Sequence, residues 1–260
     1  MNKWIELSIK YANQKSYLDD LFRVYPTIPE GIRDIDNSKW KSVETAFNKK
    51  NNEDLIKNLL QMDLFPIKDS YIAYLRRDPE AINRNPQTIN RLCGRLYELG
   101  LSKLYERCSE PKETNRQIGP LFKDWIRKKA LGIQPVPLNK FIENNDNAIL
   151  DATDAQMMDF AREKLNYKHE KGLDFVARFN NQYVIGEAKF LTDFGGHQNA
   201  QFNDAISTIS TPRVKAIKIA ILDGVLYIKG NNKMYREITR KYSNCNIMSA
   251  LVLRDFLYQL

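Results

Sequence analysis

Apolar residues recur with helical spacing through the first part of the chain. In the segment 52–60 they fall at i, i+1, i+4 and i+5 from Leu55, which places them on one face of a helix. A second helix is expected over 70–77 and should stop near Pro79, because proline interrupts helical hydrogen bonding. The pattern predicts a mainly helical region over residues 1–110, which we expect to be one domain.

The segment 85–101 is the strongest helical pattern in that region. Asn85 suits an N-cap, Pro86 the first turn and Gly100 the C-cap. Its expected buried face consists of Ile89, Leu92, Cys93 and Leu96. Its polar face carries Gln87, Thr88, Asn90, Arg91 and Arg95. The helix is similar to the recognition helix of helix-turn-helix proteins, whose amide and guanidinium groups read base edges in the major groove. An amphipathic helix with a solvated polar face is the alternative.

A β-hairpin is predicted over residues 172–190. Its apolar runs are rich in Val, Ile, Phe and Tyr, and Asn180-Asn181 suits a tight turn because Asn tolerates positive φ. A two-residue loop at these asparagines would place Asp174 directly opposite Glu187. Opposed residues have Cβ atoms roughly 4.5–5.5 Å apart. Glu187 and Lys189 would share one face of the strand, while Ala188 would face the other way.

Two adjacent carboxylates inside apolar runs repel each other unless a positive charge lies between them. Mg²⁺ is a natural candidate, since it is held by one or two carboxylates and several waters. Lys189 could then position or deprotonate one of those waters, and the metal could stabilise charge on a phosphoryl oxygen. The arrangement indicates a metal-dependent phosphodiesterase. A surface hairpin with a cross-strand ion pair is the alternative.

The remaining segments predict helices and strands around this hairpin. Residues 109–120 are expected to connect two regions, and helices are expected through Trp125 and over 155–166. Further strands are expected over 214–222, over 225–228 after a hairpin turn at Asp223-Gly224, and over 247–253, with a helix over 234–242. The paired glycines 195–196 should open a polar helix and let backbone amides approach a phosphate. The candidate DNA contacts here are Gly196, His197, Gln198, Asn199 and Gln201, and Arg116 in the connection is another.

Composition narrows the class of protein and of partner. Three cysteines without metal-ligand spacing and only two histidines argue against a structural zinc site and favour a reduced, cytoplasmic setting. No apolar run approaches the roughly 20 residues that span a bilayer, so no membrane association is expected. The formal net charge of +8 suits a polyanionic partner such as DNA, although many basic proteins bind none.

The order of these elements resembles the PD-(D/E)xK nuclease core. The stretches Lys171-Gly172-Leu173-Asp174-Phe175 and Ile185-Gly186-Glu187-Ala188-Lys189-Phe190, with Gly195-Gly196-His197-Gln198, are similar to stretches of type II restriction endonucleases. The resemblance covers roughly residues 112–260. It implies an α/β fold with a mixed central sheet flanked by helices, preceded by the helical region. The family often has a proline before the first acid, where this chain has Leu173.

The resemblance also implies roles for individual residues. Asp174 and Glu187 would bind Mg²⁺, the Ala188 carbonyl could add a ligand, and Lys189 would orient the attacking water. A further glutamate often comes from a helix behind the site, and Glu113, Glu143 and Glu163 are candidates.

The expected function is therefore sequence-specific, Mg²⁺-dependent cleavage of double-stranded DNA, leaving 5′-phosphate and 3′-hydroxyl ends. A short palindromic site would call for a homodimer. Two alternatives stay open: a structure-selective repair or recombination nuclease with the same core, and a DNA-binding regulator without catalysis.

Overall fold

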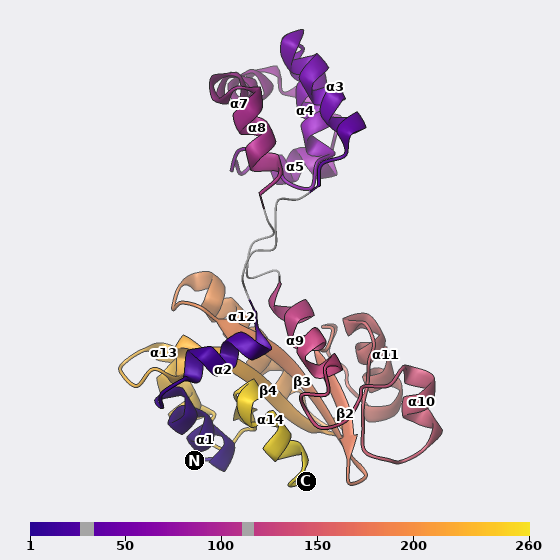
Figure 1. Ribbon diagram of the computed structural model, residues 1–260, viewed down its shortest axis with the longest axis vertical. Helices are drawn as coiled ribbons and strands as arrows, with labels where there is room; N and C mark the ends of the chain where they lie inside the picture. The colour runs from indigo at the N-terminus through magenta and orange to yellow at the C-terminus, as the bar shows by residue number, and fades with distance from the viewer. Residues whose placement is uncertain (27–33, 111–116) are drawn as a thin grey trace. The chain divides into compact units, whose positions relative to one another are not determined.

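The computed structural model describes residues 1–26, 34–110 and 117–260, which form two compact units. Residues 34–110 make a helical unit, and residues 1–26 together with 117–260 make a sheet unit (Figure 1). One boundary falls close to residue 110, as expected, but the helical unit does not include the start of the chain. The first 26 residues belong with the sheet, because their apolar side chains complete its core.

The helical unit is all α in its described part. Its helices are α3 (Asn37–Asn48), α4 (Asn52–Leu60), α5 (Ile72–Arg77), α6 (Ala81–Arg84), α7 (Pro86–Leu99) and α8 (Leu101–Cys108). The predicted inner face of α7 is confirmed, since Ile89, Leu92, Cys93 and Leu96 are all buried. Asn85 precedes this helix and Gly100 ends it with φ +77°, a backbone conformation that glycine adopts without strain.

The sheet unit is a mixed α/β structure around a five-stranded sheet of order β1-β2-β3-β4-β5. The strands are β1 (Ala148–Ile149), β2 (Phe175–Phe179), β3 (Gln182–Leu191), β4 (Ile217–Gly224) and β5 (Ile247–Met248). Neighbours β1–β2 and β2–β3 are antiparallel, whereas β3–β4 and β4–β5 are parallel.

Helices flank this sheet. They are α1 (Lys3–Ala12), α2 (Tyr17–Val24), α9 (Ile118–Arg127), α10 (Leu138–Glu143), α11 (Asp154–Leu165), α12 (Gly196–Ser210), α13 (Lys233–Arg236) and α14 (Ala250–Leu257). A 3₁₀ turn (Val225–Tyr227) and a π-helical turn (Glu237–Lys241) complete the unit. Alternate residues of β3 enter different cores: Ala188 packs in the core shared by α1, α9 and α14, and Ile185 packs with α11. None of the described helices is long and apolar enough to cross a membrane.

The predicted hairpin is confirmed in turn and register. Asn180 and Asn181 have φ of +47° and +62°, so both adopt the left-handed conformation that a tight two-residue turn requires. The pairing runs from Phe179 opposite Gln182 to Phe175 opposite Gly186. The first strand begins later than expected, and Asp174 lies directly before it. The helix predicted after residue 154 is also confirmed, and Thr153 caps it through a capping box.

Two predictions for the last 50 residues were wrong. Asp223 and Gly224 do not turn the chain into a hairpin; they end β4, and a 3₁₀ turn follows. The Asp223 side chain is fully buried, so it cannot occupy an exposed turn. The strand expected over 247–253 stops at Met248, because the Ser249 hydroxyl accepts a hydrogen bond from the Leu251 N–H and starts α14.

Asp223 accepts three hydrogen bonds, which come from two distant parts of the sheet unit. The Tyr25 hydroxyl donates to its Oδ2 at 3.0 Å, the Ala250 N–H donates to the same oxygen at 3.2 Å, and the Ser249 hydroxyl donates to Oδ1. Burial raises the pKa of this carboxyl to about 6, although these hydrogen bonds lower it. The network ties the segment after α2 to β4 and to the start of α14.

The Asp223→Asn variant should have a changed pH dependence of stability. The folded-state pKa lies above the unfolded value, so the stabilisation from Asp223 is complete below the unfolded pKa and is lost as pH rises through about 6. The free energy of unfolding of the wild type, minus that of Asp223→Asn, should fall by about 2 kcal/mol between pH 4 and pH 8. Urea unfolding across this range measures the difference. A flat or rising difference would contradict the prediction.

Candidate active site

The structure brings Asp174 and Glu187 together at the edge of the hairpin. The Asp174 N–H donates to the Gly186 carbonyl at 3.1 Å, which extends the strand pairing by one residue and sets Asp174 opposite Glu187. The Ala188 N–H donates to Asp174 Oδ2 at 2.9 Å and fixes the orientation of that carboxylate. The predicted juxtaposition of the two acids therefore exists in the fold.

Lys189 lies between the two carboxylates. Its Nζ is 3.1 Å from Asp174 Oδ2 and 2.8 Å from Glu187 Oε1. The shared face of Glu187 and Lys189 follows from strand alternation, and both residues lie in the part of β3 that pairs with its parallel neighbour β4. The three side chains thus converge on one point, where positive charge is favoured.

Glu187 is the most deeply placed of the three. Its side chain is 2% exposed, against 14% for Asp174 and 20% for Lys189. Burial and then the neighbouring Asp174 charge raise the pKa of Glu187, although Lys189 and Lys171 lower it. Its second oxygen, Oε2, is buried and has no hydrogen-bond partner among the described residues. A buried carboxylate oxygen without a partner costs free energy, so this atom is suited to a ligand that the protein itself does not supply.

Lys189 is held in its charged form. Burial would lower the pKa of its ammonium group, but the charges of Asp174 and Glu187 outweigh burial and leave the pKa above the ordinary value. A lysine in this state donates hydrogen bonds and attracts anions, but it does not accept a proton. In the protein without a metal ion, Lys189 is therefore a hydrogen-bond donor to both acids.

A second lysine, which the sequence reasoning missed, also reaches Glu187. Lys171 Nζ is 3.1 Å from Glu187 Oε1 and 2.9 Å from Asp204 Oδ2 on α12. Lys171 lies three residues before Asp174 in the sequence, but the pattern indicated no role for it. Its partner Asp204 lies 33 positions further along the chain, and the closeness of Asp204 to the site depends on how α12 packs over the strands.

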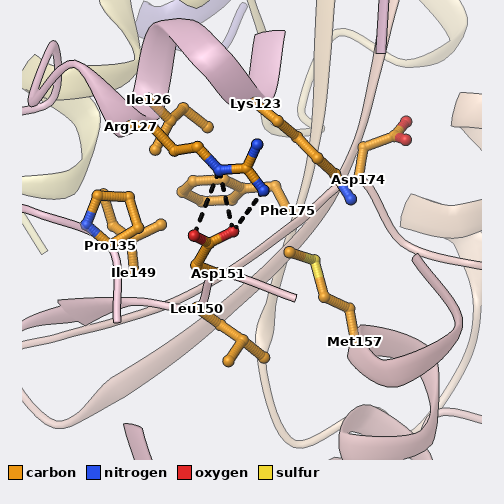
Figure 2. A pocket seen from close by; sticks show the side chains of 10 residues that line it. All are labelled: Lys123, Ile126, Arg127, Pro135, Ile149, Leu150, Asp151, Met157, Asp174 and Phe175. Carbon is orange, nitrogen blue, oxygen red and sulfur yellow. Dashed lines mark hydrogen bonds and ion pairs between the residues drawn. The ribbon is translucent and has the colours of Figure 1, made fainter. Parts of the chain in front are cut away.

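A pocket on the other side of Asp174 is lined by α9 and the segment before α11 (Figure 2). The Arg127 guanidinium donates to both oxygens of Asp151, with Nη2 to Oδ1 at 2.9 Å. Lys123 Nζ donates to Asp154 Oδ1 at 2.6 Å and to the Ala152 carbonyl at 3.0 Å. Cations and carboxylates are therefore paired along this wall, beside Asp174.

The suggested third acid does not join the site. Glu143 and Glu163 are exposed at the end of α10 and on α11, and Glu113 lies outside the described residues. Other acids share pockets with Asp174: Asp124 and Asp154 line one of them, and Asp151 lines another. Within residues 1–26, 34–110 and 117–260, no group of three or more Asp, Glu, His or Cys side chains has the arrangement of a metal site.

The candidate DNA contacts at the start of α12 occupy different environments. Gly196 and His197 are exposed, and Gln201 Nε2 lies 3.5 Å from His197 Nδ1. Asn199 donates to the Phe194 carbonyl at 2.9 Å and helps to close the loop before the helix. Gln198 is buried, and its amide exchanges hydrogen bonds with Thr192 at 3.2 and 3.1 Å. This placement gives Gln198 a role inside the unit, in holding the loop.

The candidate DNA contacts on α7 all lie on its outer side. Gln87 is exposed and Thr88 is half-buried, while the Asn90 side chain accepts a hydrogen bond from Asn52 at 2.8 Å. Arg91 is ion-paired with Asp69 at 2.7 Å, and Arg95 with Glu98 at 2.7 Å. Arg116, the remaining candidate, lies outside the described residues. A DNA phosphate would have to compete with these carboxylates for both arginines.

Comparison with known proteins places the whole chain in one family. Residues 2–260 match the model of a family described as Tsp45I type II restriction enzyme. No curated protein and no solved structure matches the chain. The match extends over both units, including the helical region for which the sequence suggested no family.

Proposed function

The chain belongs to the Tsp45I type II restriction enzyme family and is a site-specific deoxyribonuclease, and we propose that Asp174, Glu187 and Lys189 form its Mg²⁺-dependent active site. The observation that carries the proposal is the convergence of both carboxylates on Lys189 Nζ, at 3.1 and 2.8 Å. We further propose that the sheet unit is a PD-(D/E)xK core. The mixed five-stranded sheet, with the two acids on its antiparallel pair, supports that assignment.

The side chains present fit a divalent ion. Asp174 and Glu187 supply oxygen ligands, and Glu187 Oε2 has no other partner in the described part of the chain. The Ala188 N–H points to Asp174, and the N–H and C=O of one strand residue leave on the same side. The Ala188 carbonyl therefore faces the same edge and would supply a third oxygen. Two carboxylates with waters completing the shell is the arrangement that Mg²⁺ prefers.

A bound metal ion would lower the pKa of a water molecule and stabilise charge on the phosphoryl oxygens. Lys189 would donate a hydrogen bond to the attacking water and hold it in line with the scissile bond. The water oxygen would bond to phosphorus and release a proton to solvent as the P–O3′ bond breaks, and the departing O3′ would take a proton from another water molecule. The products would be a 5′-phosphate and a 3′-hydroxyl.

We propose that the helical unit reads the DNA sequence with the outer side of α7. Gln87 is exposed and without a partner in the described structure, so its amide can pair with adenine without first breaking an internal contact. Arg116, Gly196, His197, Asn199 and Gln201 would add backbone contacts. Double-strand cleavage at a palindromic site would require a homodimer, with one active site for each strand.

Cleavage of unmethylated phage DNA tests the proposed function. Purified protein is incubated with the DNA in Mg²⁺, in Ca²⁺ or in EDTA, and the products are run on a gel and their ends sequenced. Discrete bands that need Mg²⁺, with 5′-phosphate ends, are expected. Bands that persist in EDTA would overturn the metal dependence. A smear in Mg²⁺ would mean that this protein cuts DNA without the site specificity of its family.

The Gln87→Ala variant should lose discrimination between the cognate site and other sites. Loss of one bidentate base contact costs about 1–3 kcal/mol, or roughly 10- to 100-fold in binding of the cognate duplex. Binding to the cognate site and to a scrambled duplex is measured by fluorescence anisotropy in Ca²⁺. Gln61→Ala, an exposed glutamine at the end of α4, is the matched control and should bind as the wild type does. Equal weakening of both duplexes by Gln87→Ala would exclude base reading by this residue.

A further inference from the structure

Lys171 forms ion pairs with two carboxylates, one buried and one exposed. Its Nζ is 3.1 Å from the buried Glu187 and 2.9 Å from Asp204, whose side chain is 55% exposed. The backbone around Lys171 is fixed, since Gly172 lies against the start of α11 and the Leu173 N–H donates to the Asp154 carbonyl at 3.3 Å. The ammonium group is within ion-pair distance of both carboxylates but has no hydrogen bond to either among the described residues, so a small movement shifts it from one to the other.

Two ammonium groups and three carboxylates meet at this edge of the sheet, so their charges of +2 and −3 nearly cancel without a metal ion. Two lysines meet the same oxygen of Glu187, with Lys189 Nζ at 2.8 Å and Lys171 Nζ at 3.1 Å, and leave Oε2 of that carboxylate without a partner. Lys189 has a second acid in Asp174, and Lys171 has a second acid in Asp204. A divalent cation added beside Asp174 and Glu187 would place excess positive charge next to both ammonium groups.

We propose that Lys171 is a counter-ion that neutralises Glu187 in the metal-free protein, and that Asp204 holds it when a divalent cation binds. The proposal rests on the metal site proposed for Asp174 and Glu187. Lys171 is a positioning residue, because it acts through Glu187 and α12. Asp204 lowers the cost of moving Lys171 away from Glu187, so the pair sets how tightly the site holds its cation.

The movement of Lys171 from Glu187 to Asp204, called the exchange below, predicts opposite effects on cation affinity when Lys171 or Asp204 is replaced. Removing the positive charge in Lys171→Met should tighten divalent-cation binding by on the order of tenfold, because no ammonium group then competes for Glu187. Removing the second carboxylate in Asp204→Asn should weaken it by a similar factor, because Lys171 then stays on Glu187. The double variant should bind as Lys171→Met does, since Asp204 acts only through Lys171.

Calcium binding to the purified full chain, measured by isothermal titration calorimetry without DNA, tests the exchange. Matched controls carry the same charge change elsewhere: Lys168→Met on the same segment and Asp159→Asn on α11, both exposed. Each should bind calcium as the wild type does. Lys171→Arg keeps the charge and should also stay within about twofold of the wild type. Circular dichroism confirms that each variant is folded.

The outcomes separate this proposal from the active-site proposal. Weaker calcium binding in Lys171→Met, or tighter binding in Asp204→Asn, would overturn the exchange, because a merely structural role in holding Glu187 predicts loss in both. Calcium binding that is unchanged in Glu187→Gln would instead overturn the metal site itself. Wild-type affinity in both Lys171→Met and Asp204→Asn, together with loss in Glu187→Gln, would leave the metal site standing and refute the exchange.

Discussion

Replacing Asp174 with asparagine should lower the rate of DNA cleavage by at least about 10³-fold. Asparagine keeps an oxygen for the Ala188 N–H, which now donates to Asp174 at 2.9 Å, so the local backbone should stay in place. It removes the negative charge that would hold the metal ion and that attracts Lys189, so single-turnover cleavage of the cognate site should be nearly lost. The free energy of unfolding should change little, because the contact with the Ala188 N–H is kept.

Lys189→Ala should have a comparable effect for a different reason. It removes the ammonium group that lies between the two carboxylates, and with it the proposed donor to the attacking water. Lys168→Met, an exposed lysine on the segment before the site, is the matched control and should cleave normally. The quantity to compare is the single-turnover rate at saturating Mg²⁺. Wild-type cleavage by either active-site variant, once folded, would refute the assignment of these residues.

Gly224→Ala should produce the largest loss of stability among single-methyl changes in the sheet unit. Gly224 has φ +99°, which side-chain-bearing residues rarely adopt. A Cβ at this position would also overlap the backbone carbonyl of Leu191 on the parallel neighbour β3. The clash is with backbone rather than with a flexible side chain, so we expect a loss of about 3 kcal/mol or more in the free energy of unfolding.

Gly94→Ala supplies the contrast for that experiment. It adds the same methyl group within α7, where nothing beyond the chain neighbours and the helix's own backbone lies within 4 Å of the new Cβ. Alanine is the better helix former, so stability should be unchanged or rise by up to about 1 kcal/mol. Urea unfolding followed by circular dichroism measures both variants. Equal stability for the two would show that the close approach of β4 to β3 does not constrain residue 224.

The hairpin could be predicted from sequence because the information for it is local. Two asparagines that tolerate positive φ and an alternating apolar pattern fix the turn and register, and the register then places Asp174 opposite Glu187. The helix α7 was predictable for the same reason. Its cap residues and buried stripe lie within 16 consecutive positions, from Asn85 to Gly100.

Other features depend on contacts between distant segments and could not be read from a local pattern. The Asp223-Gly224 pair has the composition of a hairpin turn, but Tyr25 and Ser249 bury the carboxylate from opposite ends of the chain. The pairing of Lys171 with Asp204 exists only because α12 lies close to the segment before β2. The packing of residues 1–26 against the sheet is likewise set by partners more than 200 positions away, such as Ser249 for Ser8.

The first and last described segments of the chain complete a single core. The Asn2 N–H donates to the Ser243 carbonyl at 2.6 Å, Lys3 Nζ donates to Gln259 at 2.7 Å, and the Ser249 N–H donates to the Ser8 hydroxyl at 2.9 Å. During translation the helical unit over 34–110 emerges in full before the sheet unit does and can fold by itself, because its core is its own. The sheet unit, in which we propose that DNA is cut, must wait until β5 and α14 have left the ribosome. A nascent chain would thus present its helical unit well before it gained the capacity to damage the chromosome.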